Sequence, residues 1–117
     1  MDPGLTVDVR VSETDGVTVV VLDGELDTNS APVAQQQILP LARDGVRMVL
    51  DMAKVPYMSS AGIRMLLSTY RQVTNNGGRI VLVGVADEVK DTMSVTGFLK
   101  FFQVYDTLDA GRAAIVQ

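Results

Sequence analysis

The sequence predicts a single α/β domain over residues 1–117, with a mixed β-sheet of about five strands and about four helices. Short runs rich in Val, Ile and Leu recur along the chain, as is typical of strands. Between them lie segments in which apolar residues repeat every three or four positions, the spacing of one helix face. No repeat, linker or low-complexity segment divides these elements, so we expect one domain.

The first two strands should form a hairpin at the edge of the sheet. Apolar and polar residues alternate over residues 5–12, which is typical of a strand with one face in water. Asp15-Gly16 then turns the chain, and residues 17–22 are almost continuously β-branched, as expected for a strand covered on both faces. The second strand is therefore expected inside the sheet.

A polar connection over residues 24–30 leads into the first helix. This helix should begin near Ala31, because Pro32 is tolerated in a first turn. Pro40 cannot donate a backbone hydrogen bond, so it should kink the helix or end its regular part, and the helix should end between Leu39 and Asp44.

The centre of the chain predicts a strand, a helix and a second, parallel strand. Residues 47–52 and 79–83 are apolar at successive positions, as expected for central strands. The helix between them begins at Ser59-Ser60, whose hydroxyls can accept hydrogen bonds from the first turn. Its expected inward face consists of Ile63, Leu66, Leu67, Tyr70 and Val73. Gly62 removes a side chain near the serines, so the sequence predicts an accessible serine at a helix start.

The last part of the chain predicts two helices and a short strand. A helix over about residues 87–95 should end at Gly97, and a short strand is expected near residues 103–105. Asp106 or Thr107 should cap a last helix that runs to about Ile115. The three Phe residues all fall between the third helix and this strand, and we expect them in the core.

Composition excludes several functions. The chain has no Cys and no His, so it lacks thiolate chemistry and the usual general base, and we expect neither a metal nor another cofactor. The net charge of −4 without a basic cluster argues against nucleic acid or a membrane as the partner. No apolar run approaches the roughly 20 residues of a membrane span, and the N-terminal residues lack a signal-peptide pattern, so a cytoplasmic protein is expected.

Two other classes compete with a binding protein. A hydrolase with Ser60 as nucleophile would need a base hydrogen-bonded to the hydroxyl, and neither Lys54 nor Lys90 lies in a recognised motif. A nucleotide-binding module would need a glycine-rich phosphate loop, which the sequence does not contain. We therefore expect no enzyme activity.

Four stretches together resemble the STAS domain, and in particular the single-domain bacterial anti-sigma factor antagonists. They are Gly24-Glu25-Leu26-Asp27, the run VLDMAKVPYMSSAGIRMLL at residues 49–67, Gly77-Gly78 before an apolar strand, and MSVTGF at residues 93–98. The resemblance covers roughly residues 5–114. It implies the STAS fold, with an N-terminal edge hairpin and central parallel strands.

The resemblance also implies a partner-switching function. The unphosphorylated protein would bind an anti-sigma factor that is also a serine kinase, and so release a sigma factor. Phosphorylation would end this binding, and a PP2C-type phosphatase would restore it. By motif position the modified residue is Ser60, with Ser59 as the less favoured hydroxyl. An alternative is an adaptor role for the same domain in another partner-switching, type III secretion or transporter-associated system.

The expected partner-binding residues surround this serine. Asp27 is explained either as a turn residue or, by the family pattern, as a partner contact beside the Ser60 loop. Arg64 is explained either as a solvated surface charge or as a partner contact. Gly62 is also explained by the needs of the backbone. The complete expected set is Asp27, Asn29, Met58, Ser59, Ser60, Ala61, Gly62 and Arg64.

Overall fold

The computed structural model describes residues 7–117 and contains the elements that the sequence predicts. In this range there are five strands, four α-helices and two 3-10 turns. In chain order they are β1 (Asp8–Thr14), β2 (Val17–Asp23), α1 (Ser30–Ile38), η2 (Leu39–Leu41), β3 (Arg47–Lys54), α2 (Ser60–Asn75), β4 (Arg79–Val83), α3 (Asp87–Val95), η3 (Leu99–Phe101), β5 (Gln103–Tyr105) and α4 (Leu108–Ile115). The mixed α/β class is confirmed.

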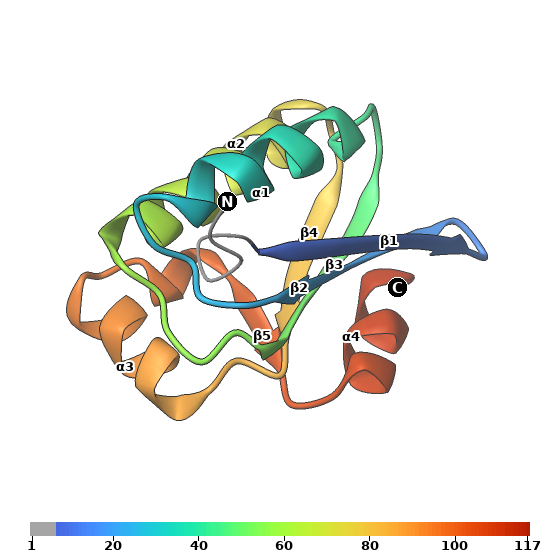
Figure 1. Cartoon of the computed structure of the whole chain (residues 1–117). Coiled ribbons are helices and arrows are strands. Elements are labelled where there is room, and N and C mark those ends of the chain that lie inside the picture. Colours follow the sequence, from blue (N-terminus) through green and yellow to red (C-terminus); the bar gives the residue numbers. More distant parts are fainter. Residues whose placement is uncertain (1–6) are drawn as a thin grey trace.

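The five strands form one sheet in the order β1-β2-β3-β4-β5 (Figure 1). β1 pairs antiparallel with β2 through the Asp15-Gly16 turn, as expected. All the other neighbours are parallel. Each parallel connection carries a helix, so the loops that leave β2, β3 and β4 all lie at the carboxyl edge of the sheet. This edge carries the two loops singled out by the sequence.

The helices divide unequally between the two faces of the sheet. The larger core cluster joins one face to α1 and α2, and Val89 and Met93 connect α3 to it. A smaller cluster on the other face joins Val17, Val49 and Val83 to Ile115 of α4. Figure 1 shows α1 and α2 side by side above the sheet, with α4 on the opposite side. The start of α2 therefore lies on the face of the sheet that carries the larger core cluster.

Local signals fixed the ends of the helices. Ser59 is the N-cap of α2, and Thr107 rather than Asp106 caps α4, with its Oγ1 accepting from the Ala110 N–H at 3.1 Å. The α-helical part of α1 ends at Ile38, one residue before the expected range of Leu39 to Asp44, and the chain continues as the η2 turn to Leu41. Pro40 lies in this turn, so the expectation that it ends the regular part of the helix is confirmed. β3 runs two residues beyond the expected end, to Lys54.

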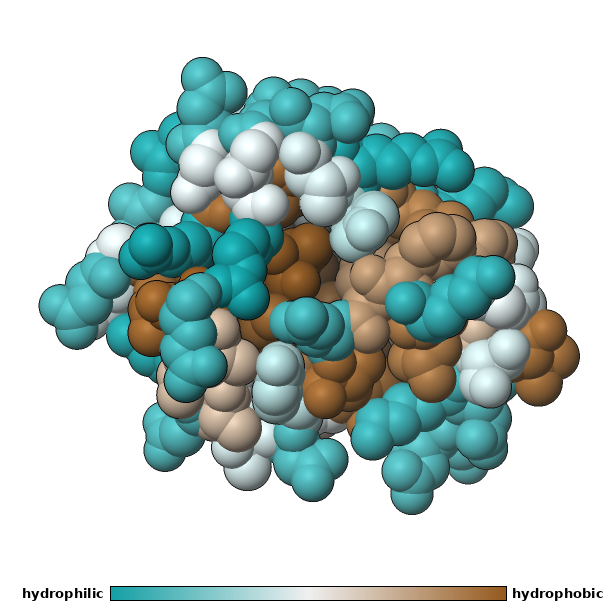
Figure 2. Space-filling model, turned by 180° about the vertical axis from the view of Figure 1, so that it is seen from behind, coloured by the Kyte–Doolittle hydropathy of each residue, from teal (hydrophilic) through white to brown (hydrophobic). Residues whose placement is uncertain are grey.

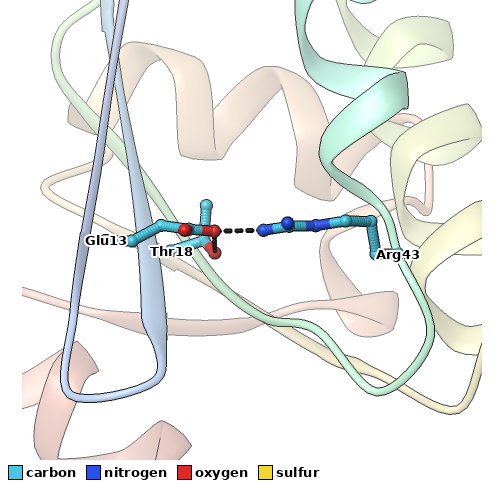
Figure 3. Close-up of polar contacts among 3 residues, drawn as sticks. All are labelled: Glu13, Thr18 and Arg43. Carbon is cyan, nitrogen blue, oxygen red and sulfur yellow. Dashed lines mark hydrogen bonds and ion pairs between the residues drawn. The ribbon is translucent and has the colours of Figure 1, made fainter.

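The first strand is more exposed than its alternating pattern indicates. Residues 5 and 6 lie outside the described range, and beyond Val9 every residue of β1 is exposed, including Val11. The hairpin turn projects past the helices in Figure 1. Figure 3 shows that Arg43, just after η2, pairs with Glu13, which also accepts from the Thr18 hydroxyl at 3.1 Å. At this end of the hairpin β1 is held by polar contacts, whereas Val17 of β2 packs in the core.

The prediction that all three Phe residues belong to the core is only partly right. Phe102 is buried and packs edge-on against Tyr70, with ring centroids 5.4 Å apart, and Phe98 is half-buried. Phe101 is 44% exposed, with Lys100 over its ring. Figure 2, which views the molecule from behind, shows apolar surface on its right-hand half, the side on which α3 lies. Phe101 ends the η3 turn, and its ring lies beside Tyr70 with centroids 6.0 Å apart.

Candidate functional site

Two loops meet at the carboxyl edge of the sheet, immediately before α1 and α2. The Leu26 N–H donates to the Tyr57 carbonyl at 3.0 Å, and the Ser59 N–H donates to the Leu26 carbonyl at 2.8 Å. A third bond, from the Gly24 N–H to the Lys54 carbonyl at 3.0 Å, holds the loops together nearer the sheet. The structure thus brings the Asp27 loop beside the Ser60 loop, although they are about thirty positions apart in the sequence.

The two serines at the start of α2 have different environments. The Ser59 side chain is partly buried, and its Oγ accepts from the Ala61 N–H at 3.2 Å, which makes it the N-cap. Ser60 is the first helical residue and is exposed, and its hydroxyl has no hydrogen-bond partner within residues 7–117. Ser59 therefore supports the helix start, and Ser60 presents a free hydroxyl to solvent.

Asp27 holds the start of α1. Its Oδ1 accepts from the backbone N–H groups of Asn29 and Ser30, both at 2.9 Å. The Ser30 hydroxyl accepts from the Asp27 N–H at 2.9 Å and donates to the Glu25 carbonyl at 2.5 Å. Donation from the Ser30 N–H, above all, holds the pKa of Asp27 below its ordinary value, so this carboxylate is charged at neutral pH.

Gly62 and Met58 lie beneath the surface that the serines form. Both are buried, and a Cβ added to Gly62 would lie 2.9 Å from both Cβ and the carbonyl oxygen of Leu26. The absence of a side chain at Gly62 is what allows the Asp27 loop to cross the first turn of α2. The sequence analysis expected both residues to bind the partner. In the structure they lie under the surface and determine how the two loops pack there.

The remaining expected residues lie on the outside. Asn29 and Arg64 are exposed, and Ala61 is half-buried. A shallow groove of about 270 Å³ runs between α1 and α2 from this point; its lining includes Thr28, Gln35, Ala61, Arg64 and Ser68. Ala61 and Arg64, which line this groove, follow Ser60 in the first two turns of α2.

Sequence reasoning missed a second hollow on the other side of the loop. Tyr57 is 52% exposed and, with Pro56 and Met58, faces Glu88 and Thr92 of α3 across a cleft of about 200 Å³. The only sequence signal was an aromatic residue just before the serines. The contribution of α3 could not be seen because it depends on where that helix lies.

This arrangement presents a hydroxyl but does not activate it. In the described range no base is hydrogen-bonded to Ser60, and no group of three or more acidic residues is placed to hold a metal ion. None of the helices within residues 7–117 has the length and apolar character needed to cross a membrane.

Comparison with known proteins shows the family to which the chain belongs. The STAS domain family matches residues 8–111 of the chain. An anti-sigma-B factor antagonist of Bacillus subtilis is 28% identical over 107 residues, which make up 92% of this chain and 96% of the relative. A crystal structure of an anti-sigma factor antagonist from Mycobacterium paratuberculosis is 29% identical, with a TM-score of 0.86 over 99% of this chain and 98% of the other. The antagonist SpoIIAA in its unphosphorylated form has the same fold, with a TM-score of 0.77 at 18% identity and coverage of 93% and 96%.

Proposed function

Because the chain belongs to the STAS domain family, we propose that it is an anti-sigma factor antagonist that is switched by phosphorylation of Ser60. The unmodified protein binds an anti-sigma factor with serine kinase activity and thereby frees a sigma factor. Transfer of phosphate to Ser60 ends the complex, and a PP2C-type phosphatase restores it. The protein works in the cytoplasm, where sigma factors act, and is a regulatory binding protein, not an enzyme.

The single observation that carries this proposal is the exposed Ser60 hydroxyl, which has no hydrogen-bond partner within residues 7–117. A kinase must bring the acceptor oxygen into line with the γ-phosphate, which requires a hydroxyl that is free to leave the surface. Modifying Ser59 would require its hydroxyl to leave the Ala61 N–H and would bring a bulky, charged group into a partly buried position. Ser60 is therefore the better acceptor of the two.

The surface around Ser60 supports protein binding. Asn29, Ala61 and Arg64 contribute directly from the loop before α1 and from the first two turns of α2. Met58 and Gly62 contribute through the backbone shape that they permit, and Asp27 through the fixed start of α1. The surface combines polar groups with small apolar ones, as is common where partners must also separate.

A binding experiment with two substitutions tests the proposal. The protein, Ser60→Ala and Ser60→Asp are each captured with an anti-sigma factor kinase from the same organism. We expect Ser60→Ala to bind like the unmodified protein and Ser60→Asp to lose binding, because a negative charge on this surface must be desolvated in the complex. Ser94→Ala and Ser94→Asp make the same two changes at an exposed serine of α3 and serve as the matched control; both should bind like the unmodified protein.

Mass spectrometry after incubation with the same kinase and ATP assigns the modified residue. Phosphate on Ser60 supports the proposal, and phosphate mainly on Ser59 contradicts the assignment. Equal binding by Ser60→Ala and Ser60→Asp would contradict the switch itself.

A further inference from the structure

We propose that Arg64 is the intramolecular partner of the phosphate on Ser60, and that phosphorylation withdraws this guanidinium from the binding surface. The inference rests on the proposed function, because it requires a phosphate at Ser60. It adds a second effect to the switch: the modification adds negative charge and also removes a free positive group.

The positions of Ser60 and Arg64 on α2 place their side chains close together. Ser60 and Arg64 are four residues apart on one continuous helix, and side chains at this spacing lie on the same stripe with Cβ atoms about 5–6 Å apart. Both residues are exposed, so neither has to leave the core for the contact. The long side chain of Arg64 easily spans this distance to a phosphate.

The charges around the site leave Arg64 available. The first two turns of α2, residues 60–67, contain no other charged residue. The ion pairs within residues 7–117 are Arg10 with Asp8 and Arg43 with Glu13, so Arg64 has no ion-pair partner in this part of the chain. Its side chain lines the groove between α1 and α2 together with Ala61, on the side of the helix that faces Thr28.

Acidic side chains near Ser60 would repel a phosphate there, so a nearby cation would stabilise it. The adjacent loop carries two carboxylates, Glu25 and Asp27, and α1 carries no charged residue. Across the Tyr57 cleft, α3 adds Glu88. The same region also holds cations, Lys54 at the end of β3 and Lys90 on α3. Arg64 is the one that lies on the same helix as Ser60, one turn away on the same face. Arginine can present two N–H groups to phosphate oxygens at once.

The inference predicts a measurable change in the phosphate itself. A cation at Arg64 favours the dianion over the monoanion, so it lowers the second pKa of phosphoserine, which is ordinarily about 6. Phosphoserine is inserted at position 60 during translation, so no kinase is needed. Its phosphorus NMR shift is then followed against pH in the otherwise unchanged protein and in Arg64→Gln, Arg64→Lys and Arg71→Gln.

Arg71→Gln is the matched control, because Arg71 is an exposed arginine on the same helix and its loss changes the net charge equally. We expect Arg64→Gln to raise the phosphate pKa by about 0.3 unit or more, in line with a surface pair on one helix. Arg71→Gln should leave it within about 0.1 unit at moderate salt, because distant surface charges are screened. Arg64→Lys should recover part of the shift.

Equal shifts for Arg64→Gln and Arg71→Gln, or no shift for either, would overturn the inference. Such a result would leave the proposed function standing, because partner binding is not part of this measurement. Conversely, a Ser60 that no anti-sigma factor kinase modifies would refute the proposed function even if the inserted phosphate pairs with Arg64.

Discussion

Two neighbouring serines are used differently because they occupy different positions at one helix start. The N-cap position of Ser59 turns its hydroxyl back toward the Ala61 N–H. At the next position Ser60 is exposed, and its oxygen accepts no hydrogen bond from the part of the chain that the structure describes. A shift of one residue thus separates a structural hydroxyl from one that another protein can reach.

The Asp27 carboxylate, like the Ser59 hydroxyl, has a structural role at a helix start. Its Oδ1 binds the first N–H groups of α1, which explains the lowered pKa. In the unfolded chain the carboxyl regains its ordinary value of 3.8, so the stability it contributes is complete above that pH. This stability is lost as pH falls below 3.8 and through the folded-state pKa.

We expect Asp27→Asn to be less stable than the unmodified protein at pH 7, with the difference shrinking below about pH 4. Asn keeps an oxygen acceptor for the N–H groups but loses the charge, so the substitution isolates the ionic part. Thermal unfolding by circular dichroism from pH 3 to pH 7 measures the difference. Asp91→Asn, at an exposed residue without a hydrogen bond in the described range, is the control. A difference that does not change with pH would refute this role for Asp27.

At the scale of elements, the site depends on how closely the Asp27 loop approaches α2. The ends of α2 could be predicted from the sequence because its N-cap and the Asn-Gly residues after it act within a few positions. The bond between Leu26 and Tyr57 could not, since it joins segments about thirty positions apart. The exposure of β1 was also missed, because alternation cannot show that a hairpin extends beyond the helices that would cover it.

Gly62→Ala should weaken this contact. The added Cβ would lie 2.9 Å from the Leu26 carbonyl oxygen, and backbone cannot move aside as readily as a side chain. Overpacking of this kind costs about 1–3 kcal/mol, against up to about 1 kcal/mol gained in helix propensity. The melting temperature should therefore fall by several degrees.

The control for Gly62→Ala is Gln72→Ala, at an exposed position of the same helix. It should leave the melting temperature close to that of the unmodified protein, because it changes no packing. If Gly62→Ala melted at or above the same temperature as Gln72→Ala, the crossing of the loop over α2 would not be as tight as described.

At the scale of the whole molecule, the binding surface and the core are separate. Figure 1 shows that α1 and α2 both begin at one end of the molecule, opposite the hairpin turn. The buried residues of α2 face the sheet, and Ser60 faces solvent. A phosphate on Ser60 therefore touches no core residue, and its negative charge lies at the positive end of the helix dipole. The modification should disrupt the complex and leave the fold intact.

The most direct test of this account compares the phosphorylated with the unmodified protein, in both partner affinity and thermal unfolding. Titration calorimetry against the anti-sigma factor kinase gives the affinity, and circular dichroism gives helix content and melting temperature. We predict at least a loss of tens of fold in affinity, since like charges across an interface cost several kcal/mol and about 1.4 kcal/mol is tenfold. The helix content should be unchanged, and the melting temperature equal or slightly higher. A large fall in melting temperature or helix content on phosphorylation would show a switch by local unfolding, and an unchanged affinity would show no switch at Ser60; either result would contradict the account.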